Sequence, residues 1–302
     1  MTSKEVDATL QSEILSVDDV DNFYRYGYVV LRDFWNRETI TSVRSAADTL
    51  LASFNPSTIP RSIFTTDEQQ RHSDDYFLNS GENISYFLEA KAIGMKGELL
   101  YRKEDCVNKI GHNLHELIPA FRAVSLEDPR IHEICKIFNY KRPVVCQSMH
   151  IVKPPRIGGA VRPHVDGAFL YTTPQSVLGF WWPLEKCTIQ NGCLWAVPGS
   201  HKRLNASTVR RFKRNLNGTG TIFDPIDEGL PFDLTGAVPL EINAGDLVLL
   251  HHSLVHYSEA NESDTSRHAY SIHIIESGSG VVYEKDNWLQ RNNGTVFPAL
   301  YE

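Results

Sequence analysis

The sequence predicts a mainly β protein with flanking helices, whose core is a two-sheet sandwich or jelly roll. Two observations support this fold class. From Pro143 onward, short segments that are continuously apolar or alternate with period two lie between Gly, Pro and Asn turns. Before Pro143, apolar residues recur mainly at helical spacing. Several short strands within about 140 residues are typical of a double-sheet domain.

The N-terminal third supplies the helices. Ser16, with Asp19 three residues later, predicts a helix start, and Gly27 predicts its end. A short strand over Tyr28–Leu31 should follow. Asn36 should cap a second helix, whose apolar positions continue to Phe54. A third helix is expected from Asp128 and Pro129 through Phe138.

The C-terminal half supplies six further strands. They are expected at 144–152, 177–184, 194–197, 238–242, 247–251 and 268–275. We therefore predict one domain over residues 1–302, in which N-terminal helices of about 15–140 buttress a core of about 141–280. Between residues 55 and 108 the pattern is irregular, and its aromatic stretch 75–87 is open to two interpretations, a lid over the substrate or packing against the core.

Composition restricts the function classes. The formal net charge is −7, so no global positive field attracts nucleic acid, and no apolar run reaches the length of a membrane span. The five cysteines include no Cys-x-x-Cys pair, which indicates free thiols in a reducing compartment. With a polar N-terminus, these features predict a cytoplasmic protein without a membrane or nucleic-acid partner; the oligomeric state is not readable.

Three residues form a candidate metal site. His164 and Asp166 lie two positions apart, so in a strand both side chains would point to one face. His256, from a distant strand, would complete the ligand set. Two imidazoles and one carboxylate, with open positions beside them, are the ligands of non-haem Fe(II) oxygenases. Zinc also accepts such ligands, but an arginine placed for a keto acid argues against it.

That arginine is Arg267, eleven residues after His256. Its planar guanidinium matches the distal carboxylate of 2-oxoglutarate, a co-substrate that would chelate the iron through its other end. If Arg267 faces the interior, Ala269, Ser271 and His273 share its face. His273 is therefore a candidate pocket residue.

At these residues the chain resembles the phytanoyl-CoA dioxygenase family, and within it the phytanoyl-CoA dioxygenase domain-containing proteins. The resemblance runs over nearly the whole chain. It is carried by the segments that begin at Phe23, Asn108, Gln147, Pro163, Asn191, Pro198 and Glu284, and by His256 and Arg267.

The resemblance implies a double-stranded β-helix core of the jelly-roll or cupin type, with iron on His164, Asp166 and His256. It also implies contacts to 2-oxoglutarate from Lys109, Met149, Trp182, Ser258 and Arg267. From the residues alone, Lys109 would be a surface lysine, and Trp182 and Met149 would be core residues. Because Asp166 is present, hydroxylation or oxidation is expected rather than halogenation.

The predicted function is that of an Fe(II)- and 2-oxoglutarate-dependent dioxygenase that consumes O2, with ascorbate as a supporting reductant. Its substrate would be a small carboxylate, a lipid-derived acid or a secondary metabolite. Candidate substrate contacts are Gln147, Phe169, Tyr171, Tyr76, Phe77 and His273.

Two other functions are considered. A catalytically silent sensor that binds the metal or 2-oxoglutarate would keep the same ligand set. A nucleic-acid demethylase could use the basic run Arg203, Arg210, Arg211, Lys213 and Arg214. Because Val209, Phe212 and Leu216 are interleaved at near-helical spacing, we interpret that run as the solvated face of a helix.

Overall fold

The fold is built on two antiparallel sheets that face each other. In the computed structural model, which describes residues 13–58, 75–204, 210–216, 220–224, 232–292 and 294–302, the larger sheet has seven strands in the order β1-β12-β7-β14-β4-β3-β2. The smaller has four, in the order β11-β8-β13-β5. The prediction of a mainly β protein with flanking helices and a jelly-roll core is confirmed.

The strands of the larger sheet come from both halves of the chain. They are β1 (Tyr28–Leu31), β2 (Ile84–Leu88), β3 (Val107–His112), β4 (Pro143–Ile151), β7 (Leu178–Pro183), β12 (Leu247–His251) and β14 (Ala269–Glu276). The smaller sheet contains β5 (Val161–His164), β8 (Leu194–Ala196), β11 (Val238–Leu240) and β13 (His256–Ser258). Two short pairs complete the strands, β9 (Arg211–Arg214) with β10 (Thr221–Asp224), and β6 (Thr172–Thr173) with β15 (Val282–Tyr283).

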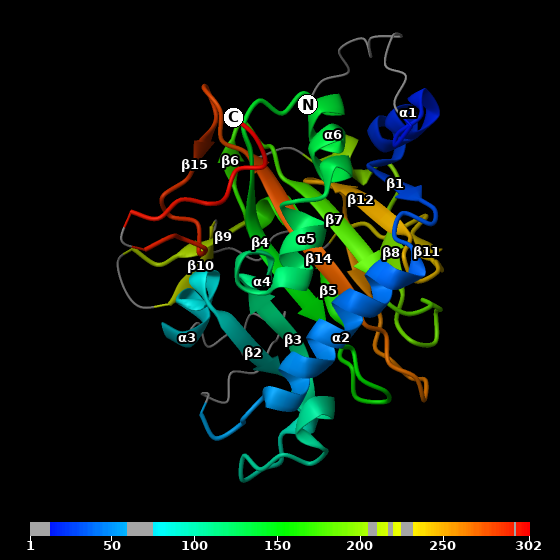
Figure 1. Cartoon of the computed structure of the whole chain (residues 1–302), viewed down its shortest axis with the longest axis vertical. Helices are drawn as coiled ribbons and strands as arrows, with labels where there is room; N and C mark the ends of the chain where they lie inside the picture. The colour runs from blue at the N-terminus through cyan, green and yellow to red at the C-terminus, as the bar shows by residue number, and fades with distance from the viewer. Residues whose placement is uncertain (1–12, 59–74, 205–209, 217–219, 225–231, 293) are drawn as a thin grey trace.

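Helices cover the outer face of the larger sheet (Figure 1). The main ones are α1 (Val17–Tyr26), α2 (Arg37–Ser53), α5 (Pro119–Ser125) and α6 (Pro129–Ile137), and two single-turn helices are α3 (Asp75–Leu78) and α4 (Leu114–Leu117). The helix starts follow the sequence prediction. Ser16 and Asp19 form a reciprocal capping box, and the Asn36 side chain accepts from the Thr39 amide at 2.9 Å. Gly27 ends α1 in the left-handed conformation, with φ of 87°.

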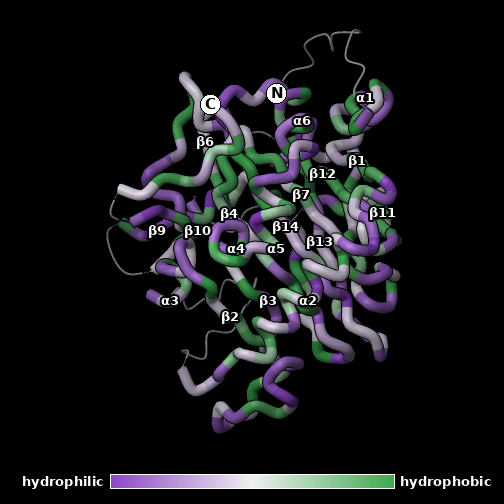
Figure 2. The backbone as a smooth tube through the Cα atoms, viewed as in Figure 1, coloured by the Kyte–Doolittle hydropathy of each residue, from purple (hydrophilic) through white to green (hydrophobic). Residues whose placement is uncertain are grey.

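Alternation along the central strands separates two environments. On β14, Tyr270, Ile272 and Ile274 pack into the apolar core shared with the helices, while Ser271 and His273 line the pocket between the sheets. Strand β12 is apolar from Leu247 to Leu250, whereas β4 carries Gln147, Ser148 and His150 among apolar residues, so apolar green and polar purple both occur along the strands in Figure 2. Both faces of these strands are buried, one in the core shared with the helices and the other toward the cavity, so nearly every position along them is buried whichever face it takes.

Two strands that the sequence prediction did not include lie within or just after the irregular stretch 55–108: β2 lies inside it, and β3 begins at its end. Strands β2 and β3 pair with each other, and β3 pairs with β4. Together with β1 they bring segments before residue 141 into the large sheet. The boundary expected near residue 141 therefore does not separate helices from sheet, because early strands extend the sheet at both edges.

The prediction of a helix in the basic run is wrong for those residues of the run that the structure describes. Arg211–Arg214 is strand β9, which pairs with β10 in a hairpin. Phe212 points inward and is buried, whereas Leu216 is exposed. Val209 lies outside the described residues. A hairpin needs pairing with a partner strand downstream, and the spacing of apolar residues within one segment does not reveal that partner.

All five cysteines are free and buried, as expected for a chain without a disulfide framework. Among the helices of the described ranges, none is long and apolar enough to cross a membrane.

Candidate active site

The three predicted metal ligands lie together at one end of the smaller sheet. His164 is the last residue of β5, and His256 is the first residue of β13, directly opposite it in the strand register. Asp166 is past the end of β5, in the 3-10 turn Asp166–Ala168. The chain stays extended through Val165, so the two-residue spacing still brings both side chains to the same side.

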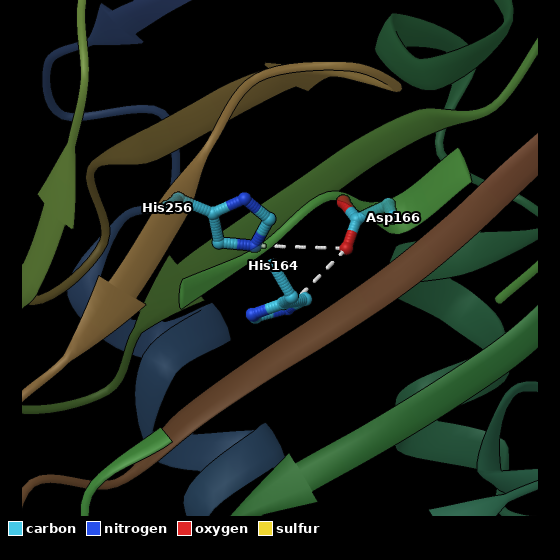
Figure 3. Close-up of side chains that lie close together, drawn as sticks. All are labelled: His164, Asp166 and His256. Atoms are coloured by element: carbon cyan, nitrogen blue, oxygen red, sulfur yellow. Dashed lines mark ion pairs between the residues drawn. The ribbon is translucent and has the colours of Figure 1, made fainter. Parts of the chain in front are cut away.

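The three side chains point toward one another (Figure 3). His164 Nε2 is 3.8 Å and His256 Nε2 is 3.6 Å from Asp166 Oδ1. One potential ligand atom from each residue lies within 4.8 Å of the others. Two ligand atoms that are each about 2 Å from one ion lie roughly 3–4 Å apart, and the two distances to Asp166 Oδ1 fall in this range. The arrangement therefore fits one metal ion.

Hydrogen bonds orient both imidazoles. His164 Nδ1 lies 2.9 Å from the Arg162 carbonyl oxygen, and His256 Nδ1 lies 3.0 Å from the Leu254 carbonyl oxygen. A carbonyl oxygen only accepts, so each Nδ1 carries the proton and each Nε2 keeps its lone pair. Histidine ligands of metal sites commonly donate their other ring N–H to a backbone carbonyl in this way, which leaves Nε2 as the ligand atom.

The charge states also suit a metal. Burial, with the neighbouring His256, lowers the pKa of His164 to about 3, so the ring is neutral at physiological pH. Burial alone would raise the pKa of Asp166, but the interactions of its carboxylate with the neighbouring imidazoles of His256, His273 and His164 lower it overall. A neutral imidazole and an ionised carboxylate are the forms that bind metal.

A glycine makes room for the carboxylate. Gly179 lies on β7 opposite His273 of β14. A Cβ atom at Gly179 would lie 2.9 Å from Asp166 Oδ2 and 3.2 Å from Leu250 Cβ. On the same side, His273 Nε2 is 3.4 Å from Asp166 Oδ2. The sheet therefore holds Asp166 between a bare backbone position and a third histidine.

The triad opens into a cavity of about 200 Å³ between the two sheets. Most of the residues predicted to bind iron, 2-oxoglutarate or substrate line this cavity. Those that do so are His164, Asp166, His256, Arg267, Lys109, Met149, Ser258, Gln147, Phe169, Phe77 and His273. Trp182, Tyr171 and Tyr76 are not among the lining residues.

One end of the cavity is cationic. Arg267 is 2% exposed; its Nε donates to the Gly192 carbonyl oxygen at 3.0 Å, and its Nη1 has no hydrogen-bond partner. Beside it, the buried Lys153 donates from Nζ to Ser258 Oγ and to the Gly159 carbonyl oxygen, both at 2.9 Å. Burial, with Arg267 nearby, lowers the pKa of Lys153 well below its usual value, so the Arg267 guanidinium is the permanent positive charge at this end. Since a buried guanidinium with a free N–H is costly, this end suits a carboxylate ligand.

The placement of Trp182 at the 2-oxoglutarate site is wrong. Its ring stacks on Trp35, with centroids 4.6 Å apart and planes at 6°, and on Tyr270 in the helix-side core. The neighbouring Trp181 lines the cavity instead, where the Arg267 guanidinium lies 5.4 Å from its ring centroid. Consecutive residues of a strand face opposite sides, so a shift of one position exchanges the pocket for the core.

Two of the predicted substrate contacts are held elsewhere. The hydroxyl of Tyr76 accepts from the Tyr86 amide at 2.8 Å, outside the cavity wall. The backbone of Tyr171 is bound on both sides by the Asn287 side chain. Within the aromatic stretch 75–87, Phe77 lines the cavity and the last residues belong to β2. The packing interpretation therefore describes this stretch better than a lid does.

Several lining residues were not proposed from the sequence. Lys153 lies just beyond the end of β4, and Trp181 lies beside a residue that was proposed. His112 and Trp288 come from elements on either side of the predicted core range, and Phe212 comes from the hairpin. Two of these residues carried a signal, because His112 and Trp288 belong to segments that carry the family resemblance.

The chain is similar to known proteins over most of its length. A model described as phytanoyl-CoA dioxygenase matches residues 23–269. An Arabidopsis thaliana protein named phytanoyl-CoA dioxygenase is 43% identical over 278 residues, which cover 92% of this chain and 94% of that protein. The phytanoyl-CoA dioxygenase domain-containing protein 1 of Danio rerio is 39% identical over 294 residues, with 96% and 99% covered.

Solved structures share the fold at low sequence identity. EctD from S. alaskensis with bound Fe has a TM-score of 0.63 and 18% identity, with 96% of this chain and 88% of that chain covered. The non-heme alpha-ketoglutarate-dependent carbocyclase SnoK from nogalamycin biosynthesis has a TM-score of 0.59 and 20% identity, with 90% and 87% covered.

Proposed function

The chain belongs to the phytanoyl-CoA dioxygenase family, and from this premise we propose that it is an Fe(II)- and 2-oxoglutarate-dependent dioxygenase that hydroxylates or oxidises a small organic substrate. One observation carries the proposal. The same cavity holds a two-histidine, one-carboxylate cluster and, at its cationic end, the buried Arg267 with a free Nη1. A metal-chelating keto acid with a distal carboxylate complements both features.

The residues present fit both groups. His164 Nε2, His256 Nε2 and the Asp166 carboxylate would hold the iron, and Arg267 with Ser258 and Lys153 would bind the far carboxylate of 2-oxoglutarate. Bound Fe(II) would supply dioxygen activation coupled to oxidative decarboxylation of 2-oxoglutarate to succinate and CO2, with ascorbate keeping the metal reduced.

The protein's own contribution is orientation and exclusion of water. The Arg162 and Leu254 carbonyls hold the two imidazoles in the tautomer that binds metal. Aromatic side chains, among them Phe77, Phe169 and Trp288, enclose the other end of the cavity. A dry surrounding protects a strongly oxidising centre from side reactions.

The first test is decarboxylation of 2-oxoglutarate. Purified protein with Fe(II), ascorbate and 2-oxoglutarate labelled at C1 should release labelled CO2, slowly even without prime substrate. Asp166→Ala should abolish the release. If the wild type binds Fe(II) and 2-oxoglutarate in calorimetry but releases no CO2, the silent-sensor function replaces this proposal; if it binds neither, both functions are refuted.

A second test addresses Arg267. Arg267→Ala should raise the 2-oxoglutarate concentration needed for half-maximal release by at least tenfold, because a charge-assisted hydrogen bond contributes about 1.5–3 kcal/mol. Arg156→Ala is the matched control, since Arg156 is an exposed arginine paired with Asp264. An unchanged requirement in Arg267→Ala would mean that another group holds the distal carboxylate.

We propose a small molecule, rather than a nucleic acid, as the substrate. In the basic run, Arg211 pairs with Asp286 at 2.6 Å, and Lys213 pairs with Asp224 and Asp286. These cations are neutralised within the protein, so they offer little to a phosphate backbone. A cytoplasmic location stays a prediction from the sequence.

A further inference from the structure

Five buried polar atoms without a hydrogen-bond partner line the same cavity. They are Asp166 Oδ2, Arg267 Nη1, Ser271 Oγ, His273 Nδ1 and His112 Nε2. Buried polar groups are almost always hydrogen-bonded, so a cluster of exceptions marks where a ligand belongs. The proposed function accounts for the first two atoms, through the iron and the 2-oxoglutarate carboxylate. It leaves Ser271 Oγ, His273 Nδ1 and His112 Nε2 without a role, and of these three His112 Nε2 belongs to the residue surrounded by aromatic rings.

His112 lies in the aromatic part of the cavity. Its ring centroid is 5.2 Å from that of Trp288 and 5.4 Å from that of Phe87, and Phe77 presents its ring to it at 89° and 6.1 Å. The residue is completely buried. Phe77, Phe87 and Trp288 all line the cavity as well, so the imidazole of His112 is a polar group surrounded by aromatic side chains.

Hydrogen bonds determine which nitrogen of His112 carries the proton. Ser80 Oγ lies 2.6 Å from the Phe77 carbonyl oxygen and 2.7 Å from His112 Nδ1. The Ser80 hydroxyl has one proton, and the carbonyl can only accept it. Ser80 Oγ must therefore accept from Nδ1–H, which leaves Nε2 as a bare acceptor. Burial, aided by Lys109 and His273, lowers the pKa of His112 well below its usual value, so the ring stays neutral.

We propose that His112 Nε2 is a specificity-determining contact, which accepts a hydrogen bond from a hydroxyl or N–H group on an apolar prime substrate. This inference rests on the proposed function, because it names the class of molecule that the same cavity oxidises. The substrate's apolar body lies against Phe77, Phe87 and Trp288, and its donor group meets the acceptor of His112. A carboxylate at this position would place its oxygens against the imidazole lone pair and is disfavoured.

Met149 offers a local reporter for binding in this cavity. The chain contains three methionines, of which Met149 lines the cavity and Met95 is fully exposed. In protein labelled with ¹³C at the methionine methyl groups, a ligand in the cavity should shift the Met149 signal and leave the Met95 signal in place. Met149→Leu assigns the resonance.

The test compares phenol with toluene as probes, because they differ by a hydroxyl in place of a methyl group. Both are titrated into the full chain without iron or 2-oxoglutarate, and the ratio of their Kd values is measured. In His112→Phe, which keeps an aromatic ring but removes the acceptor, this ratio should move by about tenfold or more against phenol. Toluene should still bind.

A second variant keeps the test decisive if His112→Phe does not fold. Ser80→Ala removes the hydroxyl that accepts from Nδ1–H, so the proton is no longer confined to Nδ1 and Nε2 is a bare acceptor for only part of the time. The ratio of the two Kd values should then move against phenol by a smaller factor. A ratio that stays at the wild-type value in the folded variants overturns the inference. The titration involves no turnover, so it tests the role of His112 separately from the proposed dioxygenase activity. Either hypothesis can be refuted while the other stands.

Discussion

The bare backbone at Gly179 is predicted to be a requirement of the metal site, and Gly179→Ala tests it. A Cβ atom there would lie 2.9 Å from Asp166 Oδ2. Comfortable contacts between carbon and another heavy atom are nearer 3.5 Å, so the carboxylate would have to move by roughly half an ångström. Metal–ligand distances tolerate only about 0.2 Å. The new methyl group should therefore displace one of the three ligands.

The expected effect is a fall in metal affinity of about 10- to 100-fold, the range found when a group that orients a ligand is changed. At 1.36 kcal/mol for each factor of ten, this is about 1.4–2.7 kcal/mol. Titration with Co(II) under anaerobic conditions, followed by absorbance and calorimetry, measures the affinity directly. The melting temperature of the metal-free variant measures the fold separately.

Gly111→Ala is the matched control. Gly111 is on β3 of the same sheet, and a Cβ atom there would lie 3.5 Å from Met149 Cγ and from the Ser148 carbonyl oxygen, at ordinary contact distance. It should leave the Co(II) affinity near that of the wild type. If Gly179→Ala binds Co(II) as tightly as the wild type does, Asp166 is not confined by β7, and the proposed reason for a glycine at this position is refuted.

Three further predictions concern other positions. Trp182→Ala should lower the free energy of unfolding by about 3–5 kcal/mol in denaturant titrations, whereas Trp181→Leu should mainly raise the 2-oxoglutarate requirement; the reverse pattern would contradict the assignment of the two faces of β7. Lys153→Met removes the donor to Ser258 Oγ and should weaken 2-oxoglutarate binding in calorimetry, while unchanged binding would assign that lysine a structural role alone. Burial raises the pKa of Cys187 to about 12 and that of Cys193 to about 11, so both thiols should stay protonated and unreactive to a disulfide reagent at pH 8 until denaturant is added; rapid labelling of the native protein would be inconsistent with their burial.

Local sequence signals were sufficient where the deciding interaction is also local. Ser16 and Asp19 form a capping box within one turn of helix, and Gly27 ends that helix, so neighbouring residues contain the whole signal. The alternation along β14 likewise placed His273 on the cavity side with Ser271, because the period of a strand is two. The spacing of His164 and Asp166 brought both toward one point, although the strand ends between them.

The misplaced residues share a different cause. Both faces of β7 are buried, one against the helices and one against the cavity, so hydrophobicity cannot show whether Trp181 or Trp182 faces the site. Strand β9 forms because it pairs with β10, and β3, with β2 at its other side, forms because it pairs with β4. The local sequence of each segment contains no information about its partner strand, so it does not predict a strand by itself.

The sequence by itself determined the ligand set, the cationic residue Arg267 and the class of fold, because these depend on residue identity and on periods of two or 3.6 along the chain. Only the tertiary structure decided that Lys153 joins Arg267, that Gly179 makes room for Asp166, and that His112 brings a bare acceptor to an aromatic wall. These contacts join segments distant in the chain, and their geometry depends on strand register and on which face each residue takes. A shift of one residue in the register of a strand would turn these side chains to the opposite face and remove the contacts.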